Sequence, residues 1–266
     1  MGETVISIKN INKNYGKHKV LTDVSLDIEK GDIFGLVGKN GAGKTTLFKV
    51  ILGLSDYQGG SLQIGSDPAH PLDGRKNIGF FVGNNLFPNM TGRENLEYYR
   101  RLKGIKDKNE VSRVLEIVDL ANAKGPVKSY SLGMRQRLGM ANSIMGDPDI
   151  LILDEPVNGL DPQGIADIRN LIKKMNEEHN MTVIVSSHIL GELQNTAHKF
   201  GIINNGSVAR VVTDDELRKL NSVVRIRVDE LDKAREVLAA AGVNVLEETQ
   251  ETRSLEDFYF DIVGRK

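Results

Sequence analysis

The sequence predicts an α/β protein with a parallel β-sheet at its core. Two continuous apolar runs of strand type, 149–153 and 181–185, are separated by an amphipathic stretch at 165–175. Strand, helix and strand at this spacing form a βαβ unit, which joins parallel strands. A third observation is a glycine-rich segment at 38–45 between a strand-like and a helix-like run. Together these segments indicate an open α/β sheet with a loop built for ligand binding.

The composition suits one ordinary globular domain with room for a small appendage. The chain has 266 residues, of which 39% are hydrophobic and 27% charged. Its net charge of −1 gives no basic field, so we expect no nucleic-acid partner. The absence of cysteine excludes disulfides, thiolate metal sites and cysteine nucleophiles. No run approaches the ~18 apolar residues of a membrane span, and no secretory signal is evident, so we expect the cytosol.

The first elements along the chain are predicted to form an antiparallel strand layer. Residues 5–11 and 24–28 alternate between apolar and polar types, as half-buried strands do. A turn at 15–17 lies between them, and 61–65 is a further short strand that ends in a turn residue. This layer is expected to pack on the parallel core.

Two later regions differ from the core. From 91 to about 145, apolar residues recur at intervals of three and four, which predicts an inserted helical subdomain at about 88–148. After about residue 212 the pattern changes again, so we expect a main domain over 1–212 and a small α+β accessory lobe over 213–266. Its expected elements are an alternating strand at 223–228, a helix at 234–241 and a closing strand at 258–262.

The glycine-rich segment is a P-loop, because it follows an apolar strand at 32–37 and precedes a helix-like run at 46–52. Gly41 and Gly43 permit the tight turn that points successive N–H groups at one anion. Lys44 is expected to reach the β- and γ-phosphates, and the Thr45 hydroxyl to bind Mg²⁺. The expected nucleotide-binding residues here are Gly38, Lys39, Asn40, Gly41, Ala42, Gly43, Lys44, Thr45 and Thr46. Kinases, GTPases, helicases and transporter motors all use such a loop.

Two carboxylates follow the apolar run 150–153 directly, at the strand end where open α/β sheets bind ligands. This is the Walker B arrangement. Asp154 is suited to hold the Mg²⁺ shell, and Glu155 to polarise the attacking water. The predicted metal-binding residues are therefore Thr45 and Asp154.

A signature-like segment lies just ahead of these carboxylates. It reads Ser129-Tyr130-Ser131-Leu132-Gly133-Met134-Arg135-Gln136-Arg137. Ser131 is a good helix N-cap, so a helix N-terminus is presented to an anion. Together with the P-loop and Walker B, this segment resembles the signature loop of the ATP-binding subunit of an ATP-binding cassette (ABC) transporter, with Ser131 and Gly133 on the matching serine and second glycine. The resemblance covers roughly 5–212.

Other segments agree with this resemblance. Residues 158–162 follow Walker B as the D-loop does, which adds Asp161 to the expected nucleotide site, and His188 matches the switch histidine that orients water beside Glu155. Tyr15 matches the aromatic residue that stacks on adenine. One departure is the segment 83–85, where the family usually carries a glutamine. That departure puts in doubt a Mg²⁺ or water contact from this loop.

The resemblance implies a P-loop NTPase fold with a RecA-like parallel sheet core. It also implies ATP and Mg²⁺ as cofactors, two ATPs held in a head-to-tail homodimer or heterodimer with a related subunit, and a separately encoded membrane permease. Such a chain lies on the inner face of the cell membrane. The run 86–96 and the Ser-Leu-Gly-Met signature are similar to those of subunits that serve drug, bacteriocin and lantibiotic exporters. Two alternatives stay open: a soluble ABC ATPase without a transport role, and a low-activity regulatory nucleotide-binding module.

Overall fold

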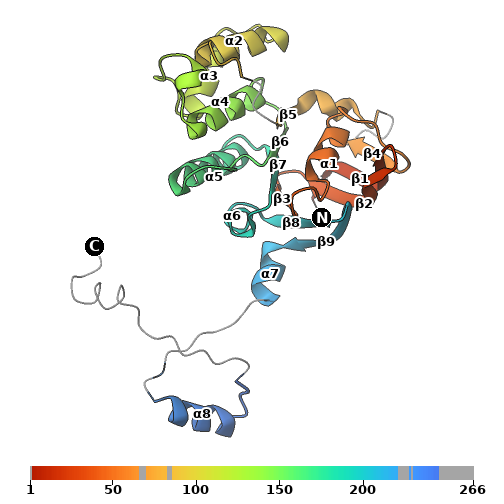
Figure 1. Cartoon of the computed structure of the whole chain (residues 1–266), viewed down its shortest axis with the longest axis vertical. Helices are drawn as coiled ribbons and strands as arrows, with labels where there is room; N and C mark the ends of the chain where they lie inside the picture. Colours follow the sequence, from red (N-terminus) through yellow and green to blue (C-terminus); the bar gives the residue numbers. More distant parts are fainter. Residues whose placement is uncertain (1, 66–69, 83–85, 221–227, 229, 246–266) are drawn as a thin grey trace, which may run out of the picture. The chain divides into compact units, whose positions relative to one another are not determined.

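The structure, a computed structural model, describes residues 2–65, 70–82, 86–220, 228 and 230–245. The chain divides after Leu220 into two compact units. In the first unit, helices pack around two β-sheets (Figure 1).

The larger sheet has six strands in the order β5-β6-β7-β3-β8-β9. Their bounds are β5 (Ile78–Phe81), β6 (Ile150–Asp154), β7 (Thr182–Ser187), β3 (Ile33–Val37), β8 (Lys199–Asn204) and β9 (Ser207–Thr213). The first five are parallel to one another, and β9 is an antiparallel edge strand on β8. The predicted parallel core is thus confirmed. Strands β8 and β9 were not predicted, because their sequences lack both a continuous apolar run and a clean alternation.

The smaller sheet is antiparallel, with the order β2-β1-β4, as predicted. Its strands are β1 (Thr4–Tyr15), β2 (His18–Glu29) and β4 (Ser61–Ile64). Ile8 lies opposite Leu26 on one side and Leu62 on the other, so the register aligns apolar side chains on one face. Strands β1 and β2 extend to the turn at Gly16, which has φ of 58°.

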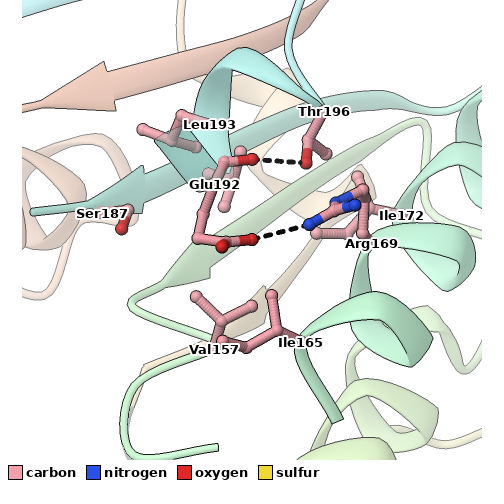
Figure 2. A pocket seen from close by; sticks show the side chains of 9 residues that line it. Val157, Ile165, Arg169, Ile172, Ser187, Glu192, Leu193 and Thr196 are labelled. Atoms are coloured by element: carbon pink, nitrogen blue, oxygen red, sulfur yellow. Dashed lines mark hydrogen bonds and ion pairs between the residues drawn. The ribbon is translucent and has the colours of Figure 1, made fainter. Parts of the chain in front are cut away.

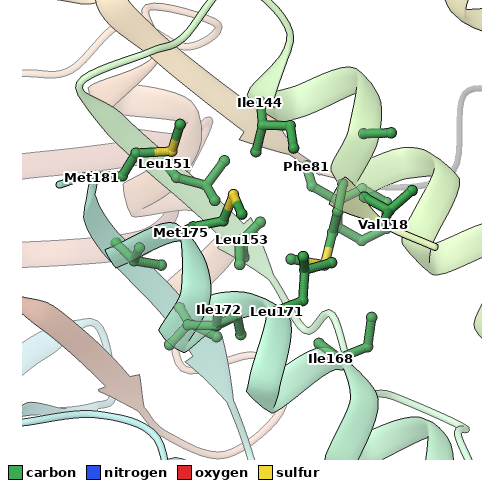
Figure 3. Close-up of a cluster of buried hydrophobic side chains, with 14 of the residues drawn as sticks. Phe81, Val118, Ile144, Leu151, Leu153, Ile168, Leu171, Ile172, Met175 and Met181 are labelled. Carbon is green, nitrogen blue, oxygen red and sulfur yellow. The ribbon is translucent and has the colours of Figure 1, made fainter. Parts of the chain in front are cut away.

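Strand β6 is buried on both faces, because its side chains alternate between two hydrophobic cores. Leu151 and Leu153 pack with α5 (Pro162–Glu177) and the helical subdomain (Figure 3). Ile150 and Ile152 pack on the opposite face with α1 (Lys44–Ile51) and the antiparallel sheet. Both cores therefore fix the strand that carries the two Walker B carboxylates.

The inserted helical region is present between β5 and β6. Its helices are α2 (Gly92–Leu102), α3 (Glu110–Ile117), the 3₁₀ turn η2 (Val127–Ser129) and α4 (Leu132–Ile144). Helix α2 begins with a capping box, in which Thr91 accepts from the Glu94 N–H and Glu94 accepts from the Thr91 N–H. Helix α4 packs on β5 so closely that a Cβ at Gly139 would collide with the ring of Phe81.

The remaining elements complete the description. They are the 3₁₀ turn η1 (Asp73–Asn77), α5 (Pro162–Glu177), α6 (Leu190–Gln194) and α7 (Asp214–Leu220) in the first unit, and α8 (Leu231–Ala240) in the second. Helix α8 covers most of the helix expected at 234–241. The strands expected at 223–228, apart from residue 228, and at 258–262 lie outside the described residues.

Candidate functional site

The P-loop follows β3 and is fitted tightly between neighbouring strands. A Cβ at Gly38 would lie 2.5 Å from the carbonyl oxygen of Ile203 on β8, and one at Gly43 would lie 3.1 Å from that of Val20 on β2. Gly41 has free space around it, but its φ of 81° is in the left-handed region that favours glycine. Sterics at two positions and backbone conformation at a third thus account for the glycines.

Backbone donors gather where the loop enters α1. The first turn of a helix leaves its N–H groups without intrahelical partners. Within the part of the chain that the structure describes, no hydrogen bond is found from the N–H groups of residues 43–46. Unpaired donors at a helix N-terminus fit an anion such as a phosphate chain. The loop therefore meets the requirement for binding the phosphates of a nucleotide.

Lys44 closes the loop with its side chain. The ammonium donates to the carbonyl oxygens of Gly38 at 2.6 Å and Lys39 at 3.2 Å. It also lies 3.2 Å from Oε1 of Glu155, which comes after β6. The Lys44 side chain is only 6% exposed, so its charge is held at the bottom of the site between the loop and a carboxylate.

Asp154 joins the P-loop to β7. Its carboxylate accepts from the Thr45 hydroxyl at 2.6 Å and from the Ser186 hydroxyl at 2.7 Å. Strand register explains this meeting, because Asp154 and Ser186 are direct neighbours on parallel strands. One carboxylate and one hydroxyl oxygen fit Mg²⁺, which binds few protein ligands and completes its shell with phosphate oxygens and water. The described residues contain no cluster of three or more His, Cys, Asp or Glu side chains that could hold a metal alone.

Glu155 is placed by an uncommon backbone conformation. Its φ is 50°, whereas every other described non-glycine residue with positive φ is Asn or Asp, which tolerate this region better. The Glu155 N–H donates to the Ser186 hydroxyl at 3.0 Å. Its Oε2 lies 2.7 Å from Nδ1 of His188. The two adjacent carboxylates thus point in different directions: Asp154 contacts Thr45, and Glu155 contacts His188.

The signature-like segment and the D-loop-like segment cap neighbouring helices. Ser131 Oγ accepts from the Met134 N–H at 3.1 Å at the start of α4, as predicted, and Asp161 accepts from the Gly164 N–H at 2.9 Å at the start of α5. Leu132 packs against Gly159, since a Cβ at Gly159 would lie 3.3 Å from Leu132 Cδ2. Among the described residues, no hydrogen bond or ion pair joins these two segments to the P-loop.

Comparisons with known proteins agree with this geometry. Residues 21–158 match the family described as ABC transporter. The chain belongs to this family. It is 40% identical over 225 residues to the bacitracin transport ATP-binding protein BcrA of Enterococcus faecalis, covering 82% of this chain and 72% of that protein. The BcrA protein of Bacillus licheniformis is 33% identical, with 98% of each chain covered.

A solved structure of an ABC cassette also resembles the chain. The dimeric, post-hydrolysis state of the cassette MJ0796 bound to ADP and Pi superposes with a TM-score of 0.68 at 26% identity, covering 79% of this chain and 98% of that one. The protein is accordingly an ATP-binding, ATP-hydrolysing subunit of an ABC transporter. No helix among the described residues has the length and apolar character needed to cross a bilayer.

The predicted site residues of this ABC subunit lie in three places: the P-loop with the ends of β6 and β7, the segments that cap α4 and α5, and the end of β1. The P-loop, Asp154, Glu155 and His188 are linked by direct contacts. Tyr15 lies at the end of β1, 50% exposed, with its hydroxyl 3.3 Å from that of Ser55. The segment 83–85, where the family glutamine is missing, lies outside the described residues.

Sequence reasoning missed Ser186 as a member of the site. Ser186 is fully buried and contacts both Asp154 and the Glu155 N–H. The available signal was its position: a polar residue in an apolar parallel strand, two places before a candidate histidine, is buried beside the neighbouring strand end. It orients the Walker B carboxylate.

A small pocket lies between α5, β7 and α6, lined in part by Ser187 at the end of β7 (Figure 2). Arg169 of α5 donates to Glu192 of α6 at 2.7 Å, and the Glu192 carbonyl accepts from the Thr196 hydroxyl at 2.9 Å. Helix α5 follows the D-loop-like segment, and α6 follows His188. The ion pair between Arg169 and Glu192 therefore connects the helices that come directly after these two parts of the site.

Proposed function

We propose that this subunit drives a separately encoded membrane permease by closing two copies of itself, head to tail, around ATP. The observation that carries the proposal is the contact network at one sheet edge: Lys44 to Glu155, Glu155 to His188, and Thr45 to Asp154. A cation, a candidate base, its orienting partner and a pair of metal-binding oxygens are the parts that phosphoryl transfer needs.

Each residue has a role in this proposal. The N–H groups of the P-loop and the Lys44 ammonium bind the phosphates, while Tyr15 stacks on adenine. Thr45 and Asp154 hold Mg²⁺, which when bound supplies charge neutralisation at the phosphates. Glu155 accepts a proton from the attacking water, and His188 fixes the orientation of that carboxylate.

The second half of each site comes from the partner copy. Ser131 and Gly133 begin α4, whose N-terminal N–H groups suit a phosphate, yet no described contact brings them to their own P-loop. Asp161 caps the neighbouring helix in the same way. A dimer in which α4 of one copy faces the P-loop of the other completes the site. The dimeric state of the related cassette MJ0796 supports this arrangement.

The names of relatives support a proposal for the cargo and the direction of transport. Similar proteins are named for bacitracin transport, for lantibiotic transport in Streptococcus pyogenes (38% identical) and for linearmycin resistance in Bacillus subtilis (33% identical). We therefore propose export of an antimicrobial peptide or related drug, from the inner face of the cell membrane. The permease is expected to dock around 81–101, and residues 213–266 to form an accessory lobe. A net charge of −1 supports the absence of nucleic acid from this function.

A Glu155→Gln variant tests the proposal. It should bind ATP with Mg²⁺ and form a stable dimer, while steady-state turnover falls by at least ~100-fold, because the base is lost but the phosphate contacts remain. Light scattering and phosphate release measure the two effects. Adding Ser131→Arg to this variant should abolish the dimer. Glu177→Gln, at an exposed position of α5, serves as the matched control and should keep wild-type turnover.

Two results would contradict the proposal. Normal hydrolysis by Glu155→Gln would remove the catalytic assignment, and ATP-bound protein that stays monomeric at all concentrations would remove the shared site. Failure to recover a multi-spanning membrane protein with the chain from detergent-solubilised cells would favour a soluble ABC ATPase. Wild-type protein that binds ATP without measurable turnover, even with its permease, would favour the regulatory module.

A further inference from the structure

Tyr130 lies directly before Ser131, the residue that caps α4. Its side chain is buried, and its ring packs within the larger hydrophobic core. The Tyr130 hydroxyl accepts a hydrogen bond from the N–H of Gly92, the first residue of α2, at 3.3 Å. A buried tyrosine hydroxyl usually has such a polar partner. This contact attaches the residue ahead of α4 to the start of α2.

The absence of a side chain at Gly92 makes this contact possible. A Cβ at Gly92 would lie 3.0 Å from the Tyr130 hydroxyl oxygen and 3.3 Å from Cδ1 of Leu138. Both distances are shorter than the optimal separation of non-bonded carbon atoms, about 3.5–4.0 Å. The close approach of the tyrosine thus favours glycine at the start of α2.

The backbone joins the same two parts of the chain. Segments 88–90 and 127–128 are connected by two backbone hydrogen bonds, both 2.8 Å long. On its other side, the Tyr130 carbonyl accepts from the guanidinium of Arg135 in α4. Tyr130 is held by α2 through its hydroxyl and by α4 through its carbonyl. These contacts therefore fix the position of the adjacent Ser131.

Ser131 has hydrogen-bonding capacity that its own copy does not use. A hydroxyl offers one proton and two lone pairs. Ser131 Oγ accepts from the Met134 N–H at 3.1 Å, but among the residues that the structure describes it donates to none. The residue is exposed, so its proton can reach an acceptor outside the chain. In the proposed dimer, a phosphate oxygen of the nucleotide held by the other copy is such an acceptor.

We propose that Tyr130 is a positioning residue, which holds the Ser131 hydroxyl where it donates to the nucleotide of the other copy. This inference rests on the proposed head-to-tail dimer. A donor that is already fixed binds more tightly, because association does not have to order it. Nucleotide binding to the P-loop of the same copy should not depend on Tyr130, since no described hydrogen bond or ion pair joins the signature-like segment to that loop.

The test is made in the Glu155→Gln background, where ATP is expected to hold the dimer without turnover. Tyr130→Phe keeps the ring and removes only the hydroxyl. It should raise the dimer dissociation constant with ATP, measured by analytical ultracentrifugation, by about three- to tenfold, because the segment ahead of Ser131 must then be ordered on association. Binding of a fluorescent ADP analogue to the monomer should be unchanged. Tyr57→Phe, whose ring packs against the second hydrophobic core, is the matched control and should leave both constants unchanged.

Two further variants test how the effect arises. Gly92→Ala crowds the tyrosine hydroxyl from the opposite side, so it should weaken the dimer as Tyr130→Phe does. Added to Tyr130→Phe, it should weaken the dimer little further, because the hydroxyl is already absent. In a Ser131→Ala background, Tyr130→Phe should have no additional effect, since the group that Tyr130 positions has been removed.

The outcomes separate the assignments. Equal dimer affinity for Tyr130→Phe and Tyr57→Phe would overturn the inference. An equally large loss of ADP affinity in the monomer would show a general structural role, and additive effects of Tyr130→Phe and Ser131→Ala would show that Tyr130 does not act through Ser131; both also overturn it. A Glu155→Gln protein that stays monomeric with ATP would instead overturn the proposed function on which the inference rests.

Discussion

The carboxylate of Glu155 bridges the Lys44 ammonium and the His188 imidazole. Its Oε1 lies 3.2 Å from Lys44 Nζ, and its Oε2 lies 2.7 Å from Nδ1 of His188. The three residues come from the P-loop, the end of β6 and the end of β7. The P-loop therefore shares one cluster with segments that lie more than a hundred residues later in the sequence. Its energetics can be measured without nucleotide.

We expect Lys44→Met to destabilise the nucleotide-free protein by about 1–3 kcal/mol, because it leaves a mostly buried carboxylate without its cation. Glu155→Gln in the same background should restore part of this loss. A double-mutant cycle by urea unfolding measures the coupling. Strictly additive effects would show that the two side chains do not interact.

The positive φ of Glu155 predicts that glycine at this position gives a more stable protein than alanine, the reverse of the usual order in a helix. Since φ is 50°, Glu155→Gly should be more stable than Glu155→Ala by about 1 kcal/mol, as the left-handed conformation costs alanine more than glycine. At Glu116, an exposed position of helix α3, the order should be the usual one, with alanine about 1 kcal/mol better. The same order at both positions would argue against the positive φ.

The helical subdomain is held on the sheet by a contact that has no room for a methyl group. Gly139→Ala should destabilise the protein by about 1–3 kcal/mol, because its Cβ would collide with the buried ring of Phe81. Gly191→Ala, in α6 with free space around it, should be neutral or slightly stabilising. Chemical denaturation of both variants makes the comparison.

Helix α2 gives the fold a pH-dependent contribution. Hydrogen bonds from Arg100 and then Arg101 lower the pKa of Glu97 from its ordinary value of 4.5 to about 2. A carboxylate with a depressed folded-state pKa stabilises the fold fully above pH ~4.5 and loses this contribution as pH falls toward 2. The stability difference between wild type and Glu97→Gln should therefore be constant above pH ~5 and shrink between pH 4.5 and 3. A difference that stays constant down to pH 3 would contradict the lowered pKa.

Local patterns in the sequence predicted much of this protein. The P-loop, the Walker B carboxylates and the N-cap Ser131 depend on neighbours within a few residues, so their roles can be recognised from short segments. The parallel core followed from apolar runs, and the structure confirms it.

Long-range contacts could not be predicted in the same way. Strand β8 owes its place to pairing with β3, and Gly38 owes its identity to the carbonyl of Ile203, more than 160 residues away. Ser186 was overlooked because its role depends on the strand beside it. Local propensity and residue spacing do not depend on these distant partners, so they cannot predict them.

The register of the central strands has a consequence for insertions and deletions. Asp154 lies beside Ser186, and Ser187 lies beside Val37, so β6, β7 and β3 end in step. Removing one residue from any of them would exchange the two hydrophobic faces and shift its terminal side chain by one strand position. Homologous chains should therefore vary in length in the loops between these strands but not within them, and reading-frame-preserving deletions selected for residual transport should avoid 33–37, 150–154 and 182–187.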